Sequence, residues 1–192
     1  MDKLRIAVLG DGGWGSTLTV LLSNKGYCVT LWGAFADYTK VMAKTRLNPK
    51  FLPGIKIPQA IEITNDIKAA VTDKEIIVLA VPSQYTRSIL KKIKGNFSRK
   101  TIFLSVTKGI EINSLKRISE VIHAELGSVK LAVLSGPTIA QEVAKGIPTT
   151  AVVASSDSAI RKYIQAVFGT ERFRLYTNDD VIGTEIAGAV KN

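Results

Sequence analysis

A lysine near the C-terminus stands among small residues at helical spacing. In the stretch TEIAGAVKN, Gly183, Ala187 and Lys191 fall at i, i+4 and i+8, so a helix would place them along one stripe. Small neighbours leave room for a ligand at the amine, and a lysine amine can exchange a proton with a bound hydroxyl group. The alternative interpretation is a solvated lysine at a frayed helix end.

A glycine-rich turn near the N-terminus is a second candidate site. In IAVLGDGGWGSTLTVLLSNKG, Gly10, Gly12 and Gly15 form the pattern G-x-G-x-x-G between an apolar run and an amphipathic stretch. The first glycine of this pattern permits a tight turn, the second admits a pyrophosphate, and the third lets helix and strand pack closely. The phosphates would face free N–H groups at the positive end of the helix dipole. The motif predicts dinucleotide binding rather than a merely structural turn.

The residues after the second expected strand leave the choice between NAD and NADP open. An NAD site usually has an acid there, about 20 residues after the glycines, to bind the ribose hydroxyls. Here Gly33 and Ala34 occupy that place, with no acid before Asp37 and no Arg to hold a 2′-phosphate. Asp11, inside the glycine turn, would weaken pyrophosphate binding unless its carboxylate points away.

Three further segments follow expected strands, where open α/β sheets bind their ligands. They read VPS, TKG and SGPT, and they carry Lys108 and Thr138. A lysine at a strand end can reach an anionic or hydroxyl-bearing substrate, and Thr138 at a helix start can meet a phosphate or carboxylate. Each also has a purely structural interpretation, as a loop cation for Lys108 and as a helix N-cap for Thr138.

The elements that must position these residues follow from the hydrophobic pattern, in which apolar β-branched runs alternate with amphipathic stretches. Strands that are apolar on both faces and separated by helices indicate an α/β fold, with a mostly parallel sheet covered by helices on both faces. The stretch RLNPKFLPGIKIPQ holds three prolines and predicts a long loop. Eight strands are expected at Leu4–Leu9, Cys28–Trp32, Ile61–Thr64, Ile76–Val81, Thr101–Val106, Lys130–Leu134, Thr149–Ala154 and Phe173–Tyr176. Helices are expected at residues 14–25, 36–45, 84–94, 114–126, 138–145 and 157–168.

Composition narrows the class of protein. The 26 basic and 16 acidic residues give a net charge of +10. The basic residues are scattered, which favours solvated helix faces and sites for small anionic ligands over nucleic-acid binding. The single cysteine, Cys28, excludes an internal disulfide, favours a reducing compartment and is expected in the core. Neither a signal peptide nor a membrane-length apolar run is apparent, so we expect a cytoplasmic protein without membrane association. No metal site is expected, and His123 should lie at the surface.

The motifs GDGGWG, VPS, TKG, SGPTIAQEVAKGIPT and GAVKN, in this order and spacing, resemble those of the NAD(P)-dependent glycerol-3-phosphate dehydrogenase family. The resemblance covers the whole chain. It implies a Rossmann-type domain at residues 1–178, with residues 179–192 starting the first helix of a C-terminal helical domain that is otherwise absent. It also implies a homodimer that interconverts dihydroxyacetone phosphate and glycerol 3-phosphate with NAD or NADP, for phospholipid synthesis. The alternatives are a dehydrogenase of the same architecture for another small hydroxy acid, and a non-catalytic nucleotide-sensing module.

The resemblance also implies roles for individual residues. Lys191 matches the family's proton acceptor, and Lys108 matches a lysine that touches both cofactor and substrate. A lysine that acts as a base must be partly neutral near pH 7, which burial and the nearby charge of Lys108 would favour for Lys191. Substrate contacts are implied at Lys108, Gly136, Thr138 and Lys191. Cofactor contacts are implied at Gly10, Gly12, Gly13, Trp14, Gly15, Phe51, Lys108 and Ala140, and at Ala34, where the family often has His or Arg.

Overall fold

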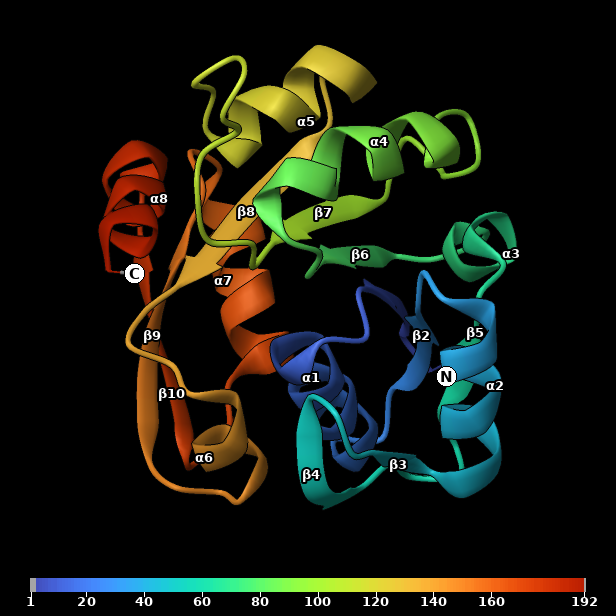
Figure 1. Cartoon of the computed structure of the whole chain (residues 1–192). Helices are drawn as coiled ribbons and strands as arrows, with labels where there is room; N and C mark the ends of the chain where they lie inside the picture. The colour runs from blue at the N-terminus through green and yellow to red at the C-terminus, as the bar shows by residue number, and fades with distance from the viewer. Residues whose placement is uncertain (1–2, 192) are drawn as a thin grey trace.

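The computed structural model describes residues 3–191, and within them eight strands form one sheet in the order β10-β9-β8-β7-β6-β1-β2-β5 (Figure 1). The predicted domain ranges 1–178 and 179–192 include three residues that lie outside the described part of the chain, namely Met1, Asp2 and Asn192. The sheet strands are β1 (Arg5–Leu9), β2 (Cys28–Trp32), β5 (Glu62–Thr64), β6 (Ile76–Leu79), β7 (Ile102–Ser105), β8 (Lys130–Ser135), β9 (Thr149–Ala154) and β10 (Phe173–Asn178). The helices are α1 (Gly13–Asn24), α2 (Ala36–Thr45), α3 (Ile67–Val71), α4 (Ser83–Ile93), α5 (Ile118–Leu126), α6 (Ala140–Ala144), α7 (Ser158–Phe168) and α8 (Val181–Val190).

Neighbouring strands of the sheet are parallel except β8 and β9, so β9 and β10 run opposite to the rest. This confirms the predicted mostly parallel sheet of eight strands. The order β5-β2-β1-β6-β7-β8 is that of a doubly wound dinucleotide-binding fold, in which the winding direction reverses between β1 and β6. Ligands of such sheets bind beyond the carboxyl ends of the strands at this reversal.

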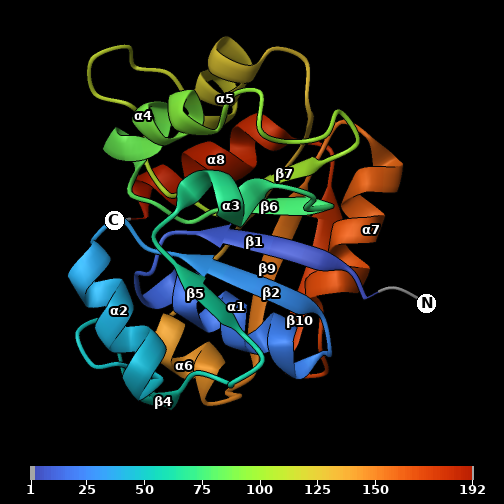
Figure 2. The same ribbon diagram turned by 90° about the vertical axis from the view of Figure 1, so that its right-hand side faces the viewer.

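Both faces of the sheet are buried, because alternate residues of each central strand enter opposite halves of the core. In β1, Ile6 and Val8 join the cluster that contains residues of α1 and α7, whereas Ala7 and Leu9 join the cluster with α3, α4 and α5. Figure 2 shows α4 and α5 on one side of the strands and α1 and α6 on the other. The prediction of helices on both faces is confirmed.

The predicted long loop at residues 46–59 is wrong in part, because it contains the antiparallel pair β3 (Leu47–Asn48) and β4 (Leu52–Lys56). Asn48 holds this hairpin to the rest of the fold, since its buried amide donates to the Asp11 carbonyl oxygen and to Ser16 Oγ, both at 2.8 Å. The short helix α3 was not predicted. The side chain of Asp66 caps it by accepting from two backbone N–H groups.

Two helices are shorter than predicted, and the remaining predicted elements agree to within about two residues. The helix predicted at 114–126 begins at Ile118, since Leu115 adopts a φ of +54° that a helix does not allow. The helix predicted at 138–145 is reduced to α6. The helix expected after Asn178 is present as α8, which packs on β8 and β9 and buries Thr184, Glu185 and Gly188.

Candidate functional site

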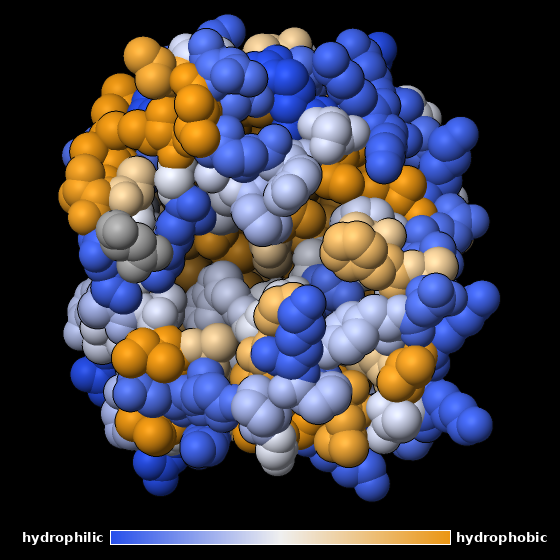
Figure 3. All heavy atoms as spheres, in the orientation of Figure 1, coloured by the Kyte–Doolittle hydropathy of each residue, from blue (hydrophilic) through white to orange (hydrophobic). Residues whose placement is uncertain are grey.

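A cavity of about 800 Å³ opens at the carboxyl ends of β1, β2, β6 and β7, where the winding direction reverses. Figure 3 shows the surface hollowed near the middle of this face. The cavity collects most of the predicted site residues, although they come from distant parts of the chain. It is lined by Gly10, Gly12, Gly13, Trp14, Ala34, Phe51, Lys108, Thr138 and Ala140. Three predicted site residues, Gly15, Gly136 and Lys191, do not line it.

The three glycines of the turn are needed for different reasons. Gly10 has a φ of +123°, and a Cβ there would lie 2.6 Å from the carbonyl oxygen of Ala80, the residue directly after the neighbouring strand β6. A Cβ at Gly15 would lie 1.9 Å from the Gly10 carbonyl oxygen, so the fold itself excludes a side chain at both positions. A Cβ at Gly12 would have no atom within 4 Å, and its φ of −65° suits any residue. The protein alone therefore gives no reason for glycine at position 12.

The β3–β4 hairpin brings Phe51 to the cavity. A Cβ at Gly13 would lie 2.7 Å from the Phe51 carbonyl oxygen, so the hairpin packs directly on the start of α1. Asn48 Oδ1 accepts hydrogen bonds from the Phe51 N–H at 3.2 Å and from the Tyr38 hydroxyl at 2.5 Å. Trp14 reaches both the cavity and the core, where its ring meets that of Phe173 edge to face with a centroid separation of 6.0 Å. Asn48, absent from the sequence-based site, is thus the residue that positions Phe51.

The end of β2 forms the next part of the wall. Trp32 is buried and donates from its ring to the Asn65 carbonyl oxygen at 3.0 Å, whereas Ala34 is exposed and lines the cavity. Asp11 extends toward this strand end, and a Cβ at Gly33 would lie 2.5 Å from its Oδ2 atom. The Asp11 carboxylate therefore points toward the end of β2.

Helix α4 contributes a wall that the sequence analysis missed. Tyr85, Ser88, Ile89 and Lys92 line the cavity and fall at i, i+3, i+4 and i+7 of the helix that follows VPS. This spacing was visible in the sequence, but it is also the spacing of an ordinary core-facing stripe. Only the position of α4 relative to the glycine turn shows that this stripe lines a cavity and is not an ordinary core-facing stripe.

Lys108 is half-buried at the floor of the cavity, beyond β7. Its ammonium donates to the Gly136 carbonyl oxygen at 3.0 Å and to the Thr138 hydroxyl at 3.3 Å, which joins three predicted substrate contacts. Burial lowers the pKa of Lys108, and the charge of Lys191 lowers it further. The two lysines implied as catalytic groups are thus close enough to influence each other.

The end of α8 carries Lys191, which is exposed in the structure. Lys108 is thus the more buried of the two lysines within the described residues. The helix itself is firmly docked, since the buried carboxylate of Glu185 accepts from the Ser119 N–H at 2.8 Å and from Arg117 Nη1 at 2.7 Å. The small residue Gly188 sits against Ser135 and Lys108.

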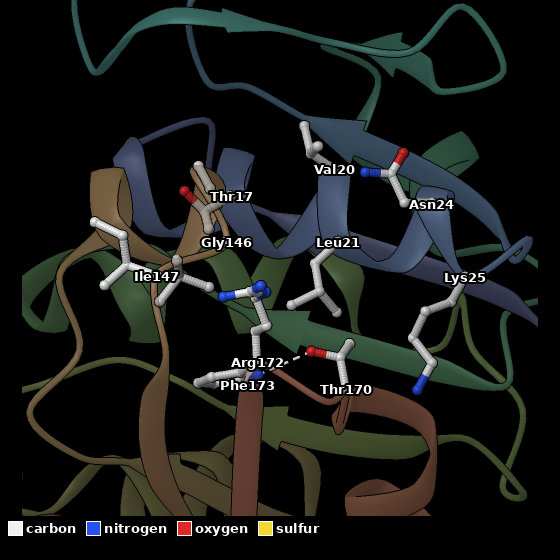
Figure 4. A pocket seen from close by; sticks show the side chains of 12 residues that line it. Thr17, Val20, Leu21, Asn24, Lys25, Gly146, Ile147, Thr170, Arg172 and Phe173 are labelled. Carbon is white, nitrogen blue, oxygen red and sulfur yellow. Dashed lines mark hydrogen bonds between the residues drawn. The ribbon is translucent and has the colours of Figure 1, made fainter.

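A second cavity of about 300 Å³ lies between α1, α6 and the start of β10 (Figure 4), and no predicted site residue lines it. Its Lys25 ammonium is already engaged by the carbonyl oxygens of Ala166 and Gly169. Its Thr17 hydroxyl donates to the Ala140 carbonyl oxygen at 3.0 Å. We therefore assign the predicted chemistry to the larger cavity.

Other expectations have mixed outcomes. His123 is exposed as predicted, but Cys28 is exposed at the start of β2 and not in the core. Within residues 3–191 no cluster of His, Cys, Asp and Glu could hold a metal ion. The same residues contain no helix with the length and apolar character needed to cross a bilayer.

Comparisons with known proteins identify the family to which the chain is similar. Residues 5–161 match the family described as NAD-dependent glycerol-3-phosphate dehydrogenase N-terminus. The glycerol-3-phosphate dehydrogenase [NAD(P)+] of Prosthecochloris aestuarii is 48% identical over 190 residues, which are 97% of this chain and 57% of that protein. That of Moorella thermoacetica is 43% identical, over 99% of this chain and 56% of that protein. The chain thus spans a little over half the length of these relatives.

Solved structures give the same relationship. The glycerol-3-phosphate dehydrogenase of Coxiella burnetii superposes with a TM-score of 0.92 at 36% identity, covering 97% of this chain and 57% of that one. A ketopantoate reductase from Ralstonia eutropha, at 16% identity and a TM-score of 0.72, covers 96% of this chain and 59% of that one and shares the fold alone. This chain belongs to the NAD-dependent glycerol-3-phosphate dehydrogenase family and corresponds to its N-terminal part.

Proposed function

We propose that the chain binds NAD or NADP in the larger cavity, with the pyrophosphate against Gly12 and the start of α1. The observation that carries this proposal is the open space at Gly12, where a side chain would meet no protein atom but would fill the cavity. The first N–H groups of a helix lack partners inside the helix and carry its positive dipole end, so they suit a pyrophosphate. The names of the relatives include NAD(P)+, in agreement with this fit.

We further propose that the whole protein interconverts dihydroxyacetone phosphate and sn-glycerol 3-phosphate. The nicotinamide supplies the hydride chemistry at C2 when it is bound. Lys108, held by the Gly136 carbonyl and Thr138, would place a positive charge beside the anionic substrate. Lys191 would remove the proton of the C2 hydroxyl group, or return it in the reducing direction. Burial and, to a smaller extent, the positive charge of Lys191 lower the pKa of Lys108, which favours the neutral form of its amine.

The exposed apolar face of α8 supports a further domain as the remainder of the protein. Ile182, Ile186 and Val190 recur at i, i+4 and i+8 and are 57%, 38% and 75% exposed. A stripe of this kind on a docked helix is a surface for burial against other elements. We propose that the part of the relatives beyond this chain forms that domain, covers Lys191 and completes the substrate site. A cytoplasmic homodimer that supplies phospholipid synthesis and binds no nucleic acid would fit the same family.

Turnover tests this proposal. The chain would be joined to the remaining C-terminal part of the Prosthecochloris aestuarii relative, to give what we call the extended protein. We expect it to oxidise NADH or NADPH with dihydroxyacetone phosphate, whereas the 192-residue chain alone should bind cofactor and turn over little. Preference of the extended protein for another keto acid would favour the dehydrogenase alternative. Cofactor binding without turnover of any substrate would favour the nucleotide-sensing alternative.

A further inference from the structure

The carboxyl group of Asp11 lies where the acid of an NAD site would be attached. In such sites the acid follows the second strand of the first unit, where this chain has Gly33 and Ala34 directly after β2. Position 33 is glycine, and a Cβ there would lie 2.5 Å from Asp11 Oδ2 and 2.7 Å from Thr39 Oγ1. The space that an acidic side chain at position 33 would occupy is thus filled by the side chain of Asp11, which follows β1.

The Asp11 carboxylate lacks a protein partner for one of its oxygens. Oδ2 is buried and accepts no hydrogen bond from residues 3–191. Asp11 also lines the cavity, together with Trp32 and Ala34, so a ligand in the cavity would lie beside this residue. Buried polar atoms in native proteins nearly always have partners, and an exception calls for an explanation such as an absent ligand.

A structural role for the Asp11 side chain is not evident in the described residues. It does not cap α2, because that helix has Phe35 at its N-cap position and no side-chain capping bond. Burial raises the pKa of the Asp11 carboxyl group, and the opposing effects of its own backbone N–H and of Lys50 are smaller. The ionised carboxylate is therefore a cost to the folded chain unless a donor from a ligand meets it.

We propose that Asp11 accepts the hydroxyl groups of the adenosine ribose and thereby selects NAD(H) over NADP(H). The inference rests on the proposed function, since it requires a dinucleotide in the cavity. A 2′-phosphate would remove one donor and bring its negative charge to the carboxylate. Residues 33–35 offer no arginine to offset that charge. The cation that acts on Asp11 is Lys50, which is exposed on the turn of the β3–β4 hairpin.

Fluorescence titration of the 192-residue chain with NADH and with NADPH tests the inference by binding alone. We expect NADH to bind at least about 30-fold more tightly than NADPH. Asp11→Asn, which keeps the shape but removes the charge, and Asp11→Ala should reduce this ratio at least about tenfold, mainly through tighter NADPH binding. Asp37→Asn is the matched control, because Asp37 is the next acid along the chain but is exposed and does not line the cavity. That control should leave the ratio unchanged.

The outcomes separate the inference from the proposed function. Binding of both cofactors with equal affinity by the unaltered chain, or an unchanged ratio in both Asp11 variants, would overturn the role of Asp11 and leave the dinucleotide site in place. A change of the ratio in Asp37→Asn as large as that in Asp11→Asn would also overturn it. Failure of the unaltered, folded chain to bind either cofactor would contradict the proposed function itself. Circular dichroism of each variant verifies that it is folded.

Discussion

Gly188 on α8 lies directly against Ser135 at the end of β8, so close that a Cβ on Gly188 would be 2.4 Å from the Ser135 hydroxyl oxygen. The same Cβ would be 3.8 Å from the Cγ atom of Lys108. This contact sets the distance between the helix that ends at Lys191 and the strand ends that hold Lys108. Gly188 of the GAVKN motif therefore serves the docking of α8 on the sheet.

Replacement of Gly188 by alanine should loosen this docking. Alanine in a helix interior is favoured over glycine by about 1 kcal/mol, so the substitution would stabilise the helix if the added Cβ met no other atom. We expect the opposite sign here, with a lower melting temperature for the 192-residue chain. Ala187→Ser on the exposed face of the same helix should melt within about 2 °C of the unaltered chain. A stabilised Gly188→Ala chain would show that α8 is not held at Ser135.

The two lysines should have separable kinetic effects in the extended protein. Lys191→Ala should lower kcat by about 10²–10⁴, the usual range for a lost acid–base group, with little change in cofactor affinity. Lys108→Ala should raise KM for dihydroxyacetone phosphate and also lower kcat. Lys130→Ala, an exposed lysine at the start of β8, is the matched control and should behave as the unaltered protein. Retention of more than about a tenth of kcat by Lys191→Ala would leave Lys108 as the proton-transfer group.

The pKa of Lys108 should lie below the ordinary lysine value of about 10.4, because burial and Lys191 both disfavour its charged form. Its folded-state pKa is lower than its unfolded-state pKa, so its contribution to the unfolding free energy rises as pH increases through the interval between them. Titration of the Lys108 side-chain NMR signal measures this pKa. In Lys191→Ala the pKa should move part of the way back up. An unchanged value in that variant would mean that the two amines do not interact.

Asn48→Ala should detach the hairpin that carries Phe51. The substitution removes a buried amide that donates to the Asp11 carbonyl and to Ser16 and accepts from the Phe51 N–H. We expect a loss of about 2 kcal/mol, or about 4–8 °C in melting temperature, together with weaker NADH binding. Asn113→Ala, at an exposed position, should change neither quantity. Unaltered NADH affinity in Asn48→Ala would exclude the hairpin from the cofactor site.

The hydrophobic pattern was sufficient to predict the strands of the sheet. Both faces of the sheet are buried, so a central strand can be apolar throughout, as in Ile76–Leu79. The β3–β4 hairpin was not predicted, because prolines occur both in turns and in short edge strands. The contact that holds the hairpin in place joins Asn48 to Asp11, which is distant in the sequence. The start of α5 at Ile118 was not predicted, because it follows from the positive φ of Leu115. A leucine in the sequence does not indicate a positive φ.

The site residues within a local sequence motif could be predicted. The site features that depend on contacts between distant parts of the chain could not. Gly10 and Lys108 follow strands within recognisable motifs, and the structure brings both to one cavity. The orientation of Asp11 toward Gly33 depends on the pairing of β1 with β2, which no local pattern reveals. The burial of Lys108 rather than Lys191 likewise follows from how α8 docks on β8.

The most direct measurement is a fluorescence titration of NADH into the 192-residue chain and its Gly12→Ala and Gly12→Val variants, with thermal melts of all three. Because no protein atom lies within 4 Å of a Cβ at position 12, the melting temperatures should agree to within about 4 °C. The added methyl or isopropyl group would stand between the start of α1 and the pyrophosphate. We predict that NADH affinity falls at least about 30-fold in both variants while the fold is retained. NADH binding of unaltered affinity by folded Gly12→Val would contradict a dinucleotide site at this turn.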